Sequence, residues 1–163
     1  MYKPDSVKDN TEALSGVGLK LGVVVSLFNR PIIDRLLEGA IQEFTAYGTD
    51  IRDIEVVFVP GAFEIPGMAK RMGRSGRFDA LVCLGAVIQG ETPHFHYISS
   101  AVSSGVALLT LELEIPVIFG LLTTSTWEQA EARSGSGDTP NKGKESALAV
   151  LKMVQLYRHF PTN

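Results

Sequence analysis

The stretch "ALVCLGAVI", residues 80–88, decides the fold. Apolar residues fill it almost completely, without the alternation of apolar and polar positions that a half-exposed strand shows. Such runs are typical of strands that are covered on both faces of a sheet. Three further runs have the same character: "LKLGVVVSLF" (19–28), "IEVVFVP" (54–60) and "PVIFGLLT" (116–123). The sequence therefore predicts four buried strands.

Helix-length segments separate these runs. In "PIIDRLLEGAIQEF" (31–44), apolar residues recur three and four positions apart, and Pro31 suits a first helical turn. The stripe consists of Ile33, Leu36, Leu37, Ala40, Ile41 and Phe44. Further helices are predicted over 94–113, 127–135 and 144–160. Because strands and helices alternate, we expect an α/β fold of the doubly wound, flavodoxin-like kind: a three-layer sandwich with a four-stranded parallel sheet and helices on both faces.

Length and composition indicate one ordinary globular domain. The 163 residues are 45% hydrophobic and 20% charged, with 15 basic and 18 acidic residues. We expect an N-terminal arm (1–17) and a single domain (18–163). No basic stripe points to nucleic acid. The only cysteine, Cys83, lies inside a predicted strand, so a buried thiol is expected and an intrachain disulfide is excluded. No apolar run has membrane length and no leader pattern opens the chain, so we expect no membrane partner and a cytoplasmic location.

Aromatic and polar residues follow the predicted strands where ligands bind in such sheets, outside the carboxyl ends. Phe28 and Asn29 follow the first run, Phe63 and Glu64 follow the second, and a histidine follows the third; Phe119 lies in the fourth. The three phenylalanines are predicted to share one rim. An aromatic cleft with a few polar groups suits a flat, polar heterocycle. The alternative is that these rings only close the end of the core.

The segment "GETPHFHY" (90–97) predicts a helix start, with Thr92 as N-cap and Pro93 as the first helical residue. Its backbone N–H groups, with those of Gly90 and Glu91, form a site for an anion such as phosphate. His94 in the first turn is then a candidate for proton transfer near neutral pH. A purely structural histidine is the alternative.

A metal site is not predicted. His96 lies two residues after His94, about 200° around a helix axis, so the two rings face different ways. The third histidine, His159, is near the C-terminus. We interpret His96 as a packing or subunit-contact residue.

Two glycine-containing stretches look like nucleotide-binding motifs but have the wrong context. "GVGLKLG" (16–22) precedes its strand, and "GDTPNKGKE" (137–145) has P-loop-like residues at the wrong spacing. The cations around the second stretch, Arg133 and Lys142, have two interpretations. Each is either simply solvated or the partner of a phosphate.

The chain resembles the lumazine synthase (6,7-dimethyl-8-ribityllumazine synthase) family from about residue 18 to its end. The motifs that carry the resemblance are "FN" (28–29), "PGAFEIP" (60–66), "LGAVIQGETPHF" (84–95), "PVIFGLLTT" (116–124), "EQAEARSG" (128–135) and "NKG" (141–143). The resemblance implies a transferase of riboflavin biosynthesis that needs no metal or organic cofactor. It would condense 5-amino-6-ribitylamino-2,4-pyrimidinedione with 3,4-dihydroxy-2-butanone 4-phosphate, releasing phosphate and water. It also implies a homopentamer whose active sites are shared between adjacent subunits.

The resemblance further assigns roles to residues. Catalysis would fall to His94 as proton carrier and to Arg133 as phosphate partner. The pyrimidine and its ribityl chain would be bound by Phe28, Asn29, Ala62, Phe63, Glu64, Val87, Ile88, Phe119 and Lys142. The phosphate would be held by Gly90, Glu91, Thr92 and Arg133. The adjacent subunit would supply Phe119, Arg133 and Lys142.

The chain departs from the family pattern at three places. Gln89 stands where a basic residue is common, and His96 where an acidic one is common. The linker "SGSGDTPNKG" (134–143) is a residue longer than in many capsid-forming members and contains Pro140, so we expect pentamers that do not close into a shell. A flavin- or lumazine-binding protein with weak or no turnover is the alternative function. Retention of both His94 and Arg133 favours the enzyme.

Overall fold

Four parallel strands form the centre of the protein, in a computed structural model that describes residues 13–162. The strands are β1 (Leu21–Ser26), β2 (Ile54–Val59), β3 (Ala80–Ile88) and β4 (Val117–Thr124). They pair in the order β2-β1-β3-β4. Three of them lie within the predicted runs and β4 extends one residue beyond its run, so the predicted four-stranded parallel sheet is confirmed.

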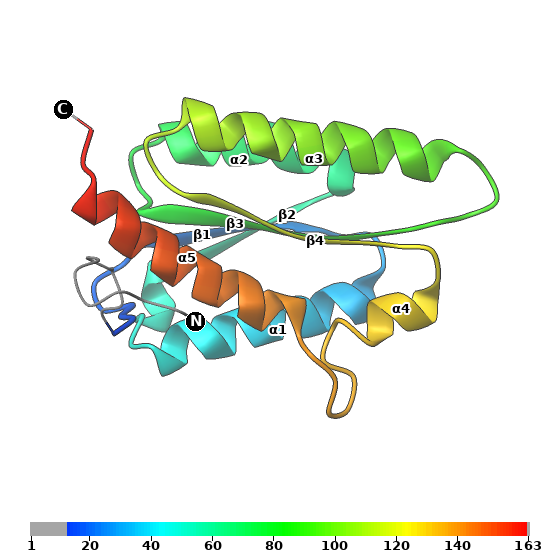
Figure 1. Cartoon of the computed structure of the whole chain (residues 1–163), viewed down its shortest axis with the longest axis horizontal. Helices are drawn as coiled ribbons and strands as arrows, with labels where there is room; N and C mark the ends of the chain where they lie inside the picture. Colours follow the sequence, from blue (N-terminus) through cyan, green and yellow to red (C-terminus); the bar gives the residue numbers. More distant parts are fainter. Residues whose placement is uncertain (1–12, 163) are drawn as a thin grey trace, which may run out of the picture.

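Helices cover both faces of the sheet, which gives three layers (Figure 1). On one face lie α1 (Arg30–Ala46), α4 (Trp127–Glu131) and α5 (Lys142–His159). On the other lie α2 (Ile65–Arg74) and α3 (His94–Glu112). Two short 3-10 turns, η1 (Ile51–Asp53) and η2 (Ala62–Glu64), flank β2. The predicted α/β sandwich is therefore correct. None of the helices in the described range is long and apolar enough to cross a membrane.

The continuous apolar character of the strands follows from burial on two sides. In β1, Val23 and Val25 pack into the core beside α1 and α5, whereas Val24 between them packs into the core beside α2 and α3. The same alternation places Cys83 of β3 in the second core, where it is fully buried. Burial raises the pKa of the Cys83 thiol to about 12, because the thiolate would lose its hydration. The inner strands β1 and β3 therefore have almost no solvent face, whereas the edge strand β2 is only partly buried and its Phe58 is exposed.

The predicted stripe of α1 is mostly correct. Ile33, Leu36, Ala40 and Phe44 are fully buried against the sheet and α5. The other two members of the stripe are only partly buried, because they lie at its margins. The helix is therefore fixed by one apolar face.

The predicted N-terminal arm is only partly within the described range. Residues 1–12 lie outside it, whereas the segment 13–17 contacts the domain. The backbone N–H of Gly16 donates to the carbonyl of Tyr47 over 2.8 Å, and Leu14 packs against the core. A Cβ on Gly16 would lie 2.1 Å from Oγ1 of Thr49, so only glycine fits this contact. The last part of the arm is attached to the end of α1.

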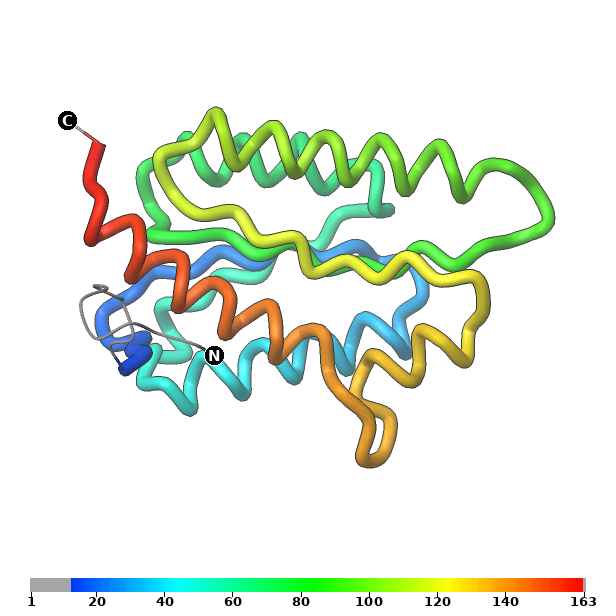
Figure 2. Tube along the Cα trace, viewed as in Figure 1, coloured from blue at the N-terminus to red at the C-terminus, as the bar shows by residue number. Residues whose placement is uncertain are grey.

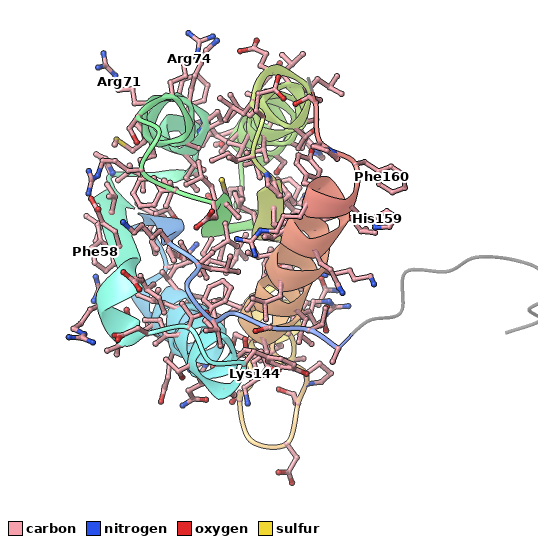
Figure 3. All side chains as sticks on the ribbon, turned by 90° about the vertical axis from the view of Figure 1, so that its left-hand side faces the viewer. Phe58, Arg71, Arg74, Lys144, His159 and Phe160 are labelled. Atoms are coloured by element: carbon pink, nitrogen blue, oxygen red, sulfur yellow. The ribbon has the colours of Figure 1, made fainter. Side chains whose placement is uncertain are left out.

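The carboxyl ends of all four strands meet at one edge of the sheet. This edge is on the right in Figure 1, where β1 leads to α1, β3 to α3 and β4 to α4. The tube in Figure 2 shows the long turn from β3 into α3 at the same end. Figure 3 looks from the opposite end, where Arg71 and Arg74 of α2 point outward. Polar and aromatic residues that follow the strands are therefore gathered at the carboxyl edge.

Candidate active site

A cleft of about 540 Å³ opens at the carboxyl edge of the sheet. This volume falls within the range of about 300–1,000 Å³ that small-molecule sites occupy. The cleft is lined by Phe28, Asn29, Gly61, Ala62, Phe63, Glu64, Ala86, Val87, Ile88, Gly90, Thr92, His94, Phe95 and Ile98. The segments after β1, β2 and β3 thus build one wall each.

Two phenylalanine rings flank the cleft with unusual exposure. Phe28 follows β1 and is 71% exposed; Phe63 lies in η2 and is 60% exposed. Rings that only closed the core would be covered by it, so the alternative interpretation of these residues is wrong. Large exposed apolar side chains in a concave site indicate a surface for a ligand with a flat apolar face.

Asn29 fixes the turn that presents Phe28. It is the N-cap of α1 and has φ 63°, the one positive φ of a non-glycine residue in the described chain. Its Nδ2 donates to the carbonyl of Ala86 on β3 over 2.9 Å. Asparagine tolerates the left-handed conformation better than most residues because its short amide can bond locally. The first and third walls of the cleft are therefore joined through this side chain.

The second wall comes from the short turn after β2. Gly61 is followed by η2, whose Ala62 is buried and whose Glu64 is exposed beside the cleft. A Cβ on Gly61 would lie 3.1 Å from Oε2 of Glu64, so the carboxylate lies close over the glycine. This wall offers the cleft an acidic acceptor for hydroxyl or amide groups.

The third wall is the start of α3, and here one prediction was wrong by a residue. The helix begins at His94 with Pro93 as N-cap, and no side chain caps it. Pro93 has φ −66° and ψ 0°, outside the helical range, so the chain turns helical only after it. The hydroxyl residue Thr92 lines the cleft instead, beside Gly90. Because α3 has 19 residues, its uncapped N-terminus carries the partial positive charge that favours an anion.

Histidines do not form a metal site here. His94 lines the cleft, whereas the ring of His96 stacks edge-on against Phe95, with centroids 5.3 Å apart. Within residues 13–162, the structure holds no group of three or more His, Cys, Asp or Glu side chains that could bind a metal ion.

The family model described as 6,7-dimethyl-8-ribityllumazine synthase matches residues 18–158. The chain belongs to this family. Membership supports a lumazine synthase function in general and small-molecule substrates. The match covers every segment that lines the cleft.

Four residues that the lumazine synthase resemblance assigns to the site do not line the cleft of their own chain. Phe119 is the third residue of β4, opposite Cys83, and is half-buried against the core beside α2 and α3. The expected rim of three phenylalanines is therefore wrong for a single chain, because β4 continues for five residues beyond Phe119. Glu91 is exposed and does not line the cleft, although it stands between two residues that do.

Arg133 and Lys142 are the other two residues outside the cleft. Arg133 follows α4 and its Nη1 donates to the carbonyl of Gln129 over 2.9 Å. Lys142 opens α5, and its Nζ lies 3.0 Å from Oε2 of Glu145. Both cations are at the surface, and neither contacts His94's cleft within its own chain.

Four lining residues escaped the sequence analysis: Gly61, Ala86, Phe95 and Ile98. Ile98 lies one helical turn after His94, so the spacing of four residues could have placed both on one face. Ala86 precedes Ile88 by two positions at the end of β3, which is the strand period. For Phe95 and Gly61 no such periodicity was available.

Proposed function

We propose that the protein makes 6,7-dimethyl-8-ribityllumazine. The substrates are 5-amino-6-ribitylamino-2,4-pyrimidinedione and 3,4-dihydroxy-2-butanone 4-phosphate, and the reaction releases phosphate and water. The proposal rests on one observation. In a chain of this family, one cleft brings two exposed phenylalanines together with His94 at the start of α3.

The pyrimidine substrate fits the first two walls. A flat heterocycle stacks on Phe28, and the backbone of Val87 and Ile88 at the end of β3 is placed to read its edge. The ribityl chain carries hydroxyl groups, which donate to the carboxylate of Glu64 and pass over Ala62 and Phe63. Asn29 stabilises the turn that carries Phe28.

The phosphate-bearing substrate fits the third wall. Its anion binds the backbone N–H groups of the segment from Gly90 through Thr92, at the positive end of α3. His94 in the first turn then lies beside the reacting carbon chain. The 5-amino group attacks the ketone carbonyl and water leaves, phosphate is then eliminated, and the ribitylamino nitrogen attacks the second carbonyl and closes the ring with loss of a second water. His94 carries the protons that must move in these steps. No cofactor is needed for these steps.

The cations complete the site from a neighbouring copy. Arg133 and Lys142 lie outside their own chain's cleft, so the proposal places them, with Phe119, at the cleft of the adjacent subunit. Arg133 pairs with the phosphate, for which a bidentate guanidinium is suited. This arrangement requires an oligomer, and the family resemblance makes it a homopentamer.

One assay tests the proposal. The protein is mixed with both substrates in the presence of EDTA, and lumazine formation is followed by its absorbance and fluorescence. We expect turnover that needs both substrates and is unaffected by the chelator. Binding of lumazine or flavin without any product would show the alternative function, a binding protein of the same fold.

A further inference from the structure

The linker between α4 and α5 is a closed loop, seen at the lower edge of Figures 1 and 2. Its base is held by an antiparallel bridge between Ser134 and Asn141. The N–H of Gly135 donates to the carbonyl of Pro140 over 3.0 Å, and the N–H of Lys142 donates to the carbonyl of Arg133 over 2.8 Å. The two ends of the linker are therefore fixed to each other before α5 begins.

The side chain of Asn141 ties this base to the rest of the fold. Its Nδ2 donates to the carbonyls of Arg35 in α1 and of Ser134, each over 2.9 Å. Its Oδ1 accepts from the N–H groups of Gly143 and Lys144, at 2.8 and 3.2 Å. An asparagine amide has two N–H donors and two acceptor lone pairs, so all four bonds are in use. Lys144 marks the start of α5 beside the loop in Figure 3.

Glycines make the room that this amide occupies. A Cβ on Gly39 of α1 would lie 2.5 Å from Oδ1 of Asn141, and one on Gly135 would lie 2.7 Å from its Nδ2. Gly143 cannot be replaced by a larger residue, since a Cβ at this position would lie 1.9 Å from the carbonyl oxygen of Leu36. The amide is therefore enclosed by backbone from three elements.

The hydrogen-bonded base of the loop determines where the side chains of Arg133 and Lys142 reach the surface. Residues opposite each other in an antiparallel pair point to the same face, and their neighbours along the strand point to the other. Ser134 is fully buried, and its Oγ accepts from Nε of Arg35 over 3.0 Å, so the bridge faces inward. Arg133 and Lys142, one position outward, consequently emerge together on the outer face.

We propose that Asn141 is a positioning residue for phosphate binding, because it sets the geometry of the Arg133 and Lys142 pair. This inference rests on the proposed function, in which Arg133 pairs with the phosphate-bearing substrate. Asn141 itself does not touch substrate. It acts through the loop base, so its loss displaces Arg133 and Lys142 together, and the phosphate site is affected most because Arg133 is its only side-chain cation.

Two variants separate this role from helix capping. Asn141→Ser keeps an oxygen that can cap α5 but loses both donated bonds, whereas Asn141→Ala loses the cap as well. A displaced Arg133 loses the paired geometry with which a guanidinium binds phosphate. Since losing such charge-assisted bonds weakens binding about tenfold or more, we expect both variants to raise KM for the butanone phosphate by about that factor. KM for the pyrimidine should rise much less, because Lys142 is only one of the many groups assigned to that substrate. The melting temperature should fall further for Asn141→Ala than for Asn141→Ser.

Thr139→Ala is the matched control, because it removes a bond at the tip of the same loop, from Oγ1 to the carbonyl of Ser136. We expect it to change neither KM. Equal KM increases for both substrates, or no change with Asn141→Ser and Asn141→Ala, would overturn the inference.

Hydrogen exchange at the amides of Gly135 and Lys142 is measured in parallel. Protection should be lost in Asn141→Ser, and retained protection would also overturn the inference. A wild-type protein without turnover would instead contradict the proposed function, while the exchange result would still stand.

Discussion

Asn29 and Ala86 join two walls of the cleft by one hydrogen bond, from Nδ2 of Asn29 to the carbonyl of Ala86, 2.9 Å long. The residues are 57 positions apart in the chain and stand at the carboxyl ends of neighbouring strands. Asn29 also has φ 63°, so its backbone conformation and its side-chain bond together hold Phe28 at the cleft.

Substitutions at Asn29 should separate the contribution of its hydrogen bond to stability from that of its backbone conformation. Asn29→Gly keeps the left-handed backbone without strain but loses the hydrogen bond, which contributes about 1 kcal/mol. Asn29→Ala loses the bond and adds about 1–2 kcal/mol of backbone strain. We therefore expect Asn29→Ala to lower the free energy of unfolding in urea more than Asn29→Gly does. Equal losses would show that the backbone conformation contributes nothing.

His94 is expected to move protons. Changing it to alanine should lower kcat by roughly ten- to a thousandfold, at or below the roughly hundred- to ten-thousandfold that a general acid or base usually contributes, while the protein keeps its assembly state. His96→Ala is the matched control, since His96 lies on the same helix but outside the cleft. Steady-state kinetics of both variants decide the point. An unchanged kcat in His94→Ala would remove His94 from the mechanism.

Arg133→Ala should weaken the phosphate-bearing substrate far more than the pyrimidine. Charge-assisted hydrogen bonds contribute about 1.5–3 kcal/mol, which corresponds to a rise in KM of about 10- to 150-fold. Arg133→Lys should restore only part of the affinity, because lysine cannot bind an anion through two parallel N–H groups. Lys144→Ala, a change to another cation beside the same loop, serves as control. Equal weakening of both substrates would contradict the assigned role.

Much of the fold could be predicted because most strand residues are buried. Continuous apolar runs indicated all four strands. The rule that ligands bind at the carboxyl ends of such strands led to Phe28, Phe63 and His94, which line one cleft. Arg133, which lies outside that cleft, was supplied by the family resemblance alone.

Other features depend on distances that a sequence does not contain. Phe119 was misplaced because it was taken as a rim residue, although it is the third residue of β4 and the strand continues for five residues beyond it. The bond between Asn141 and Arg35 joins residues 106 positions apart, and no local pattern reports it. Thr92 satisfies every sequence preference for an N-cap, but the backbone angles of Pro93 move the helix start past it.

Cys83 should be inert in the folded protein. Burial raises the pKa of its thiol from the ordinary value of 9.0 to about 12, so the reactive thiolate is absent near neutral pH. A raised pKa also means that the neutral thiol's contribution to stability is complete below pH 9 and is lost as the pH rises toward 12. A thiol reagent at pH 8 should therefore label the chain only after denaturation. Rapid labelling of the native protein would contradict the burial of this residue.

The assembly should be a homopentamer that does not close into a sixty-subunit shell. A pentamer is expected because Arg133 and Lys142 lie outside the cleft of their own chain, and the proposed site needs them from an adjacent copy. The shell is not expected because of the loop between α4 and α5, which is a residue longer than in many capsid-forming members of the family. Its base is closed from Gly135 to Pro140, and the fixed φ of Pro140 restricts how the loop can fold back.

Light scattering with sedimentation velocity at neutral pH distinguishes the possible assemblies. A mass of about five chains is the expected result. A particle near sixty subunits would show that the closed, longer loop is compatible with shell contacts, and the argument from Pro140 would be wrong. A monomer would also contradict the shared active site, because a cleft without the neighbouring Arg133 could not bind phosphate as proposed.

Deleting one residue from the tip of the loop, between Ser136 and Thr139, tests the effect of loop length directly. If the length of the loop prevents shell closure, the shortened protein should shift toward larger particles.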